Sequence, residues 1–376
     1  MNIDDIVRRA RPDSTGWTHS EAGRRVLDEI VTAAPAEGSA DRRVAGRSGP
    51  ALRWSLLGTG LAGAVAAGVL AVSVISTPQQ SRPDSPPVAG QQPDATTTLL
   101  ARDILLAAAN RAEQAPAETG RYWHVKTLDL TGPQRAGDAG YWLLRRSVTE
   151  SWDASDPAEA SWTGHRDLGV RPASQADERA WRAAGAPSEW TLDTDGPKPL
   201  VLSTRPDAGT LSRDRSAPRY LEDLGQLDLE QVRRLPDEPR ALRAWTSERI
   251  RARMGVPAGS PTSDRLLFGF LGRMLLDTPA PPKVRGAAFR ILAEIPGVRG
   301  LDAVTDAHGR SGQGVEFRDD SGTVRLIVDP STHRLLGEQT SSTPKDAAVP
   351  GKQSTTVVLT AQWSDAAPQR PSLPQE

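Results

Sequence analysis

The chain has 376 residues, a formal net charge of −1 at pH 7 and no cysteine. The lack of cysteine excludes disulfide bonds, thiol catalysis, cysteine metal ligands and a lipid-modified cysteine anchor. Stability must therefore come from a packed core, for which the length suffices. Because 46 basic residues are balanced by 47 acidic ones and form no basic patch, we expect no nucleic-acid partner.

Residues 1–53 predict a short segment with a single amphipathic helix. Thr18 and Glu21 have the spacing of a capping box, and apolar residues then recur at helical intervals. Two interpretations stay open. Residues 1–34 either form a docking helix for a cytoplasmic regulatory protein, or they are a loosely ordered tail whose charges only set topology.

Residues 54–77 predict a transmembrane helix. No charged side chain occurs between Arg53 and Arg82. At about 1.5 Å per residue, a helix over most of this run spans the roughly 30 Å core of a bilayer. The run contains GTGLAG, which matches the dinucleotide pattern G-x-G-x-x-G. No strand is predicted before it and no acidic residue follows at the ribose position, so we expect helix packing and no nucleotide cofactor.

The charges on either side of this span predict its orientation. Residues 42–53 carry arginines and no acid, whereas residues 79–95 carry one arginine and two aspartates. By the positive-inside rule, residues 1–53 are expected in the cytoplasm and the rest of the chain outside, with the lipid bilayer as a partner. The composition of residues 78–96, rich in Pro, Gln and Ser, predicts a linker between the membrane and an outer domain.

The outer domain is expected over residues 97–365, and it opens with a helix at about 97–115 that Pro116 ends. The composition of the sequence then changes. Segments rich in aromatic and β-branched residues alternate with Gly, Pro and Asp clusters, which is typical of an antiparallel meander. We expect its strands at 121–130, 141–155 and 160–169. The following region is less regular, with short strands in SEWTLD and PLVLST.

Three helices follow in the predicted order. The first begins near Pro239, the second after Ser263 as N-cap, and the third after Pro281-Pro282. The chain then returns to strands, with a hairpin at 315–329, a turn into RLLGEQTSS and a last strand at 355–365.

This order of strands, helices and strands predicts the α+β class. The simplest assembly is an extracytoplasmic antiparallel sheet, of which a half-barrel is one form, with helices packed on it and one transmembrane helix in front. The polar, Pro-rich residues 366–376 are expected to be a disordered tail.

Signatures of chemistry are missing, since the sequence has no G-x-S-x-G, H-E-x-x-H or Walker loop. We therefore predict no catalytic residue, no cofactor and no metal site. His124 and His165 fall in neighbouring predicted strands, where a polar sheet face explains them. Asp193 and Asp195 resemble a fragment of a calcium loop but lack its further acids and distal Glu, so a turn is expected.

Tryptophan is concentrated in the first part of the outer domain. Two interpretations stay open: a hydrophobic groove for a lipid or another envelope ligand, or the core of the sheet, where each indole N–H needs a partner. The first interpretation makes four residues candidate ligand contacts, namely Trp123, Trp142, Trp152 and Trp162.

Three blocks of the chain resemble recurrent blocks in actinobacterial single-pass membrane proteins of unknown function. They are LPDEPRALRAW (235–245), TPAPPKVRGAAFRILAEIPGVRGLDAVTDAHGRSGQGVEF (278–317) and LIVDPSTHRLLGEQ (326–339). The resemblance covers the plan of the whole chain and implies a location and a fold, but no activity. One departure is His333, where the family more often has Gly; His tolerates the left-handed conformation better than most residues.

A more distant likeness, in architecture alone, is to envelope proteins with half-barrel sheets that bind lipid chains or monitor stress, some of which regulate sigma factors. The sequence thus predicts a non-enzymatic membrane protein whose outer domain binds a ligand or an envelope partner. The first alternative is a transmembrane regulator, anti-sigma-like or a co-regulator, that uses residues 1–34. The second is an envelope hydrolase, which would need a deep polar cleft that gathers His124 or His165 with carboxylates.

Overall fold

The computed structural model describes residues 95–192, 199–344 and 349–372. The predicted cytoplasmic segment, the membrane helix at 54–77, nearly all of the linker and the Asp193–Asp195 turn lie outside the described residues.

The predicted fold class needs a correction in its membrane part. Among the described helices, none is long and apolar enough to cross a membrane. The first of them, α3 (Ala95–Glu113), carries Arg102, Asp103 and Arg111 and packs against the domain that follows it. The described residues therefore form an α+β domain, and each described helix is part of this domain and not a membrane span.

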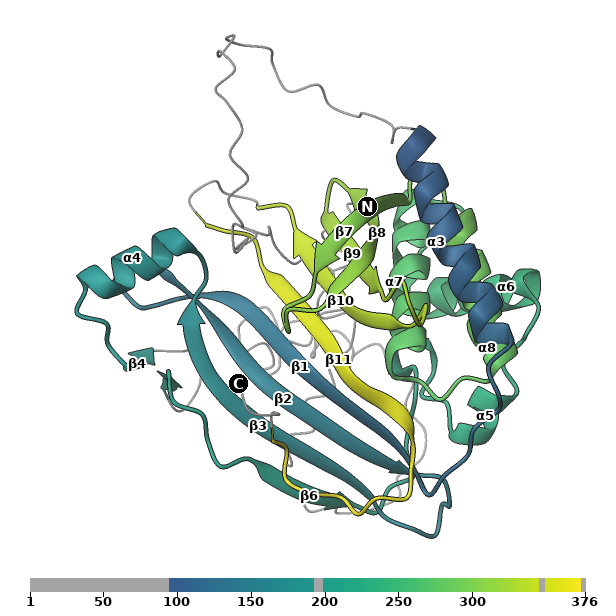
Figure 1. Cartoon of the computed structure of the whole chain (residues 1–376), viewed down its shortest axis with the longest axis horizontal. Helices are drawn as coiled ribbons and strands as arrows, with labels where there is room; N and C mark the ends of the chain where they lie inside the picture. Colours follow the sequence, from purple (N-terminus) through teal and green to yellow (C-terminus); the bar gives the residue numbers. More distant parts are fainter. Residues whose placement is uncertain (1–94, 193–198, 345–348, 373–376) are drawn as a thin grey trace, which may run out of the picture.

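A single antiparallel sheet of nine strands forms the frame, in the order β6-β3-β2-β1-β11-β10-β9-β8-β7. It consists of two meanders that meet where β1 pairs with β11, so that the first and the last described strand of the chain lie side by side at the centre of the sheet (Figure 1). The strands are β1 Tyr122–Arg135, β2 Trp142–Ala154, β3 Ser161–Pro172, β6 Thr210–Asp214, β7 Arg299–Thr305, β8 Ser311–Asp319, β9 Gly322–Val328, β10 Leu335–Ser342 and β11 Gln353–Ser364.

Four helices, α3, α6, α7 and α8, gather on one face of the β7–β11 half of the sheet (Figure 1). Helix α7 lies against β8–β11, α3 contacts β7 and α8, and α6 packs on α7 and α8. Most residues of α7 after its first turn are buried, as expected of a helix covered on several sides. The bounds are α5 Leu229–Arg233, α6 Pro239–Met254, α7 Pro261–Asp277 and α8 Pro282–Glu294, with a 3-10 turn at Glu222–Leu224.

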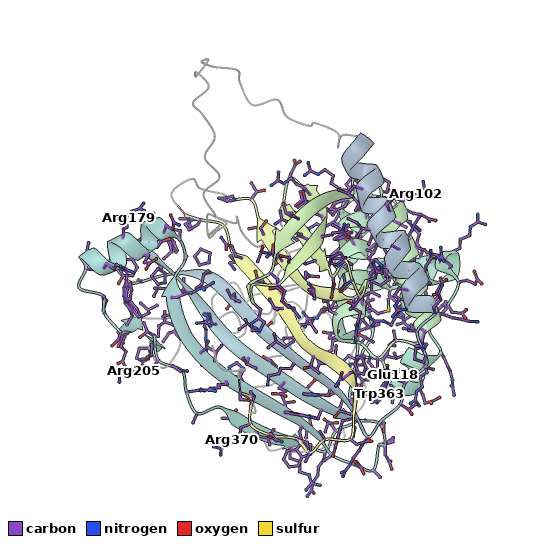
Figure 2. All side chains as sticks on the ribbon, viewed as in Figure 1. Arg102, Glu118, Arg179, Arg205, Trp363 and Arg370 are labelled. Atoms are coloured by element: carbon purple, nitrogen blue, oxygen red, sulfur yellow. The ribbon has the colours of Figure 1, made fainter. Side chains whose placement is uncertain are left out.

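The two faces of the sheet have different coverings, because side chains alternate along each strand. We call the face under α7 the helix face; Trp123 and Val125 of β1 and Val358 of β11 join the main core there. The opposite face, here the outer face, carries a separate apolar cluster that includes Leu128, Val148 and Val357. Trp363 of β11, labelled in Figure 2, meets Trp123 edge-on at a centroid distance of 5.5 Å.

Some elements differ from their sequence prediction. The N-cap of α7 is Ser260, whose Oγ accepts a hydrogen bond from the N–H of Ser263, so the helix starts one turn before the predicted cap. Strand β7, at the edge of the sheet, was not predicted. Neither was α4 (Gln175–Ala183), which precedes a small hairpin of β4 (Glu189–Leu192) and β5 (Leu200–Ser203). His333 has the left-handed conformation expected of its turn, with φ 57°.

The segment after β11 also differs from the disordered tail expected at 366–376. Residues 366–372 are described, and Pro371 is buried against Gly164 of β3. The N–H of Arg121 donates to Asp365 Oδ1 at 2.9 Å, which holds the start of the segment beside β1. The chain thus turns back along the sheet after its last strand (Figure 1).

Candidate ligand-binding pocket

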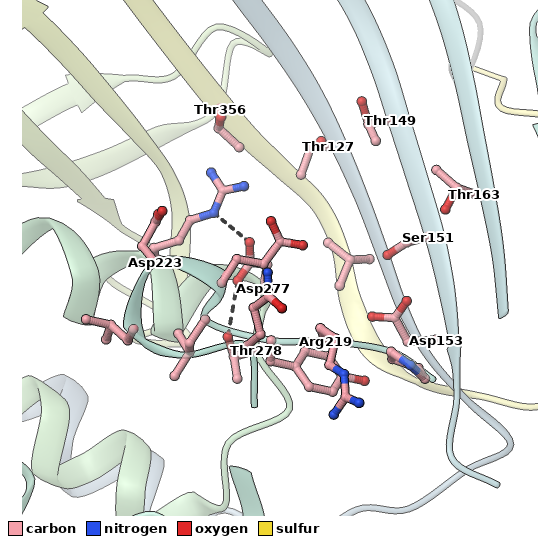
Figure 3. Close-up of a pocket in the computed structure, with 18 of the residues that line it drawn as sticks. Thr127, Thr149, Ser151, Asp153, Thr163, Arg219, Asp223, Asp277, Thr278 and Thr356 are labelled. Carbon is pink, nitrogen blue, oxygen red and sulfur yellow. Dashed lines mark hydrogen bonds and ion pairs between the residues drawn. The ribbon is translucent and has the colours of Figure 1, made fainter. Parts of the chain in front are cut away.

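A pocket of about 410 Å³ lies on the helix face, beyond the part that α7 covers. Its floor is formed by β1, β2, β3, β10 and β11, and its walls by the C-terminal half of α7 and the loop 216–226 (Figure 3). The volume lies in the range of pockets that hold small molecules, roughly 300–1,000 Å³.

Hydroxyl groups line the floor of this pocket. Alternation places Thr127 and Thr131 of β1 on the helix face, next to Thr149 and Ser151 of β2 and Thr163 of β3. Figure 3 shows four of these side chains, Thr127, Thr149, Ser151 and Thr163, side by side on neighbouring strands. The same face is mostly apolar where the helices cover it and hydroxyl-rich where they do not.

A row of three residues crosses the centre of the floor. Thr356 of β11 stands opposite Asp129 of β1 on one side and opposite Glu338 of β10 on the other. The hydroxyls of Thr127 and Thr356 donate to the Asp129 carboxylate at 2.8 and 2.9 Å. Burial nevertheless raises the pKa of Asp129, because the hydroxyls of Thr127, Thr356 and Thr149 and the charge of Arg273 offset only part of the lost hydration.

Glu338 is the most unusual residue of the pocket. It is 5% exposed, and its Oε2 accepts no hydrogen bond within the described part of the chain. Gly272 lets α7 come close enough to bury this carboxyl, since a Cβ there would lie 3.4 Å from Oε2 and 2.7 Å from a methyl of Leu326. Burial raises the pKa of Glu338 to about 7; Asp277 adds to this, and Arg273 and Arg265 oppose it.

Arg273 of α7 lies over the row. Its Nε forms an ion pair of 2.6 Å with Asp277 Oδ2, one helical turn further on, and this carboxylate is the main reason that the pKa of Arg273 is raised. The carboxyls of Glu338 and Asp129 act in the same direction. The end of α7 is tied to the sheet because Trp123 Nε1–H donates to the carbonyl of Asp277 at 2.7 Å.

The four tryptophans predicted as ligand contacts are not gathered in one place, and none of them lines the pocket. Trp123 is buried in the main core. Trp152 and Trp162 are cross-strand partners in a small apolar cluster of their own, where Trp152 stacks on His124 at 4.9 Å. Trp142 is half-buried at the start of β2. A tryptophan-lined groove stays a prediction, since no ligand contact of these residues is known.

The two histidines expected in neighbouring strands are separated by β2. His124 of β1 lies 2.8 Å from Glu150 Oε1, while His165 of β3 stands opposite Thr149. Over the residues that the structure covers, no group of three or more His, Asp or Glu side chains is arranged to hold a metal ion.

Sequence reasoning did not find the pocket, although β1 carries a signal for it. Thr127, Asp129 and Thr131 alternate with Leu128 and Leu130, so one face of the strand is polar in the middle of a domain. Such a pattern is also typical of a strand whose polar face meets solvent. Only the wall formed by α7 and the loop 216–226 makes that face the floor of a pocket.

No protein-family model matches the chain, and no curated protein matches it significantly. The resemblance to actinobacterial membrane proteins of unknown function therefore stays a prediction.

Proposed function

We propose that this domain is a non-enzymatic binding module that takes a small polar ligand into the pocket between α7 and the helix face of the sheet. The observation that carries the proposal is the lining of the pocket, in which hydroxyls from three adjacent strands surround a volume of about 410 Å³. Protein interiors are normally close-packed. A hollow of this size bordered by hydrogen-bonding groups is best explained by a ligand that fills it.

The same lining favours a polar ligand over a lipid chain. An acyl chain would remove water from Thr149, Ser151 and the carboxyls without replacing their hydrogen bonds, and each such loss costs free energy. A ligand that carries hydroxyl or amino groups restores those bonds. The expected location in the cell envelope and the alternative role as a regulator depend on residues outside the described ones and stay predictions.

A pocket-filling substitution tests this proposal. Thr149→Phe places a ring on the floor of the pocket, so small polar compounds should bind about tenfold more weakly or not at all. Binding of neutral sugars, diols and diamines to the full-length chain would be measured by saturation-transfer NMR and calorimetry. Thr191→Phe, on the exposed side of β4, is the matched control and should bind like the unchanged protein.

Lipid vesicles serve as the competing ligand in the same experiment. If compounds bind equally well to the unchanged chain and to Thr149→Phe, the pocket is not their site and the proposal is wrong. It is also wrong if the domain takes up lipid and none of the polar compounds.

A further inference from the structure

We propose that the ligand of this pocket carries a positively charged ammonium group, and that this group binds against the carboxyl of Glu338. The proposal rests on the proposed binding function and names the chemical class of its ligand.

The first argument is that Glu338 lacks a partner where a partner is needed. Its side chain borders the pocket, is almost entirely buried, and has an oxygen that accepts no hydrogen bond from any residue that the structure describes. A buried carboxyl oxygen left in this state is costly. A donor supplied by a ligand would remove that cost.

The second argument is that the cations near Glu338 are engaged elsewhere. The charged groups that face it are Arg265, Arg273 and Asp277 from α7, and Asp129 lies two strands away in the same row. Arg265 pairs with Asp319 at 3.1 Å, and Arg273 pairs with Asp277 at 2.6 Å. Neither guanidinium hydrogen-bonds to Glu338.

The third argument concerns the balance of charge. Arg273 forms an ion pair with Asp277, and the charges of Glu338 and Asp129 also help to raise its pKa. A single guanidinium cannot neutralise all three carboxyls, and the hydroxyls around Asp129 supply hydrogen bonds but no positive charge. One further positive charge would bring this cluster of carboxyls closer to neutrality. A ligand can supply that charge from the pocket, which these residues line.

An ammonium group fits this gap better than a neutral hydroxyl. It has three N–H donors, so it can donate to Glu338 and still reach hydroxyl acceptors on the floor, such as Thr356. A sugar hydroxyl would donate one hydrogen bond and leave the carboxyl cluster without its charge partner. The two classes of ligand therefore differ in how binding depends on the ionisation of Glu338.

This dependence has a definite sign. With a pKa of about 7, the Glu338 carboxyl is mostly protonated at pH 6 and mostly ionised at pH 8. An ammonium ligand needs the ionised form, so its affinity should rise about tenfold between these two pH values. A neutral ligand should show no such rise.

The experiment compares two probes of equal length, 1,5-diaminopentane and 1,5-pentanediol, by calorimetry on the full-length chain. At pH 8 the diamine should bind at least about tenfold more tightly than the diol, and most of this preference should be lost at pH 6. Glu338→Gln keeps the shape of the side chain and should abolish the preference at both pH values. Glu189→Gln, on exposed β4, is the matched control and should retain it.

Each result bears on one of the two proposals. Equal binding of diamine and diol, weakened by Thr149→Phe, would overturn the ammonium proposal and leave the pocket as a binding site. A preference for the diamine that survives Glu338→Gln would place the ammonium group elsewhere and also overturn it, as would failure of the diamine to bind at millimolar concentration. Binding that Thr149→Phe leaves unchanged would overturn the proposed function itself.

Discussion

At the scale of single residues, Glu338 shows how the fold sets the chemistry of a side chain. A glutamate in a strand normally points its carboxylate to water and has a pKa near 4.5. Here α7 covers it at Gly272, and the desolvated carboxyl prefers the protonated form. The charged form of this residue destabilises the domain relative to the neutral form, which is a property of its place in the fold.

Glu338→Gln should therefore change stability in a pH-dependent way. The raised pKa means that the favourable contribution is present below about pH 4.5 and is lost as pH rises through 7. Relative to the unchanged protein, the free energy of unfolding of the variant should rise by roughly 3 kcal/mol between pH 4 and pH 8. Urea unfolding at both pH values would measure the difference, and an equal effect of the substitution at both would contradict it.

At the scale of elements, α7 joins the core to the pocket. Its apolar residues between Leu267 and Leu276 pack in the main core, and Arg273 and Asp277 near its C-terminal end line the pocket. The sequence predicts this helix, but it places the cap at Ser263. A serine, a proline and another serine stand within four residues, and each is common at the start of a helix, so the local pattern does not decide between the two serines.

Ser260→Ala should destabilise the domain by about 1 kcal/mol, because it removes the acceptor for the N–H of Ser263. Ser260→Thr keeps a hydroxyl at the cap and should cost clearly less. Chemical unfolding of the two variants beside the unchanged chain would measure this. Equal stability of the Ala and Thr variants would show that the side chain of Ser260 does not act as the cap.

At the scale of the whole molecule, the end of the chain packs back on the sheet on the side away from the pocket. Ser161 and Thr163 of β3 line the pocket, so Gly164, which contacts Pro371, faces the opposite way. The C-terminal segment and the ligand site thus use different faces of the same strand.

Two truncations test this arrangement. A chain that ends at Asp365 loses the buried Pro371 and should be less stable by about 1 kcal/mol, while a chain that ends at Ser372 should match the full-length protein. Ligand binding in the pocket should be the same for both. Equal unfolding midpoints for the two truncated chains would show that the segment does not stabilise the sheet.

The sequence by itself determined several local elements of the described domain. Prolines at the first positions of α6 and α8 and the Asp-Asp-Ser-Gly turn between β8 and β9 act within a few residues. These two helices and this hairpin can therefore be predicted from their own segments. The α+β order of the domain follows from the same signals. Strand β7 was missed because its residues, RGLDAVT, show no clear alternation and become a strand only by pairing with β8.

Only the tertiary structure decided where the candidate site lies. Asp129 and Thr356 are far apart in the chain and meet because β1 pairs with β11, and Glu338 is buried because α7 lies over β10. The tryptophans show the same limit. They lie close together in the sequence, but the fold places them on different faces of the sheet. Desolvation and charge pairing depend on neighbours in space, and one sequence without its fold does not specify those neighbours.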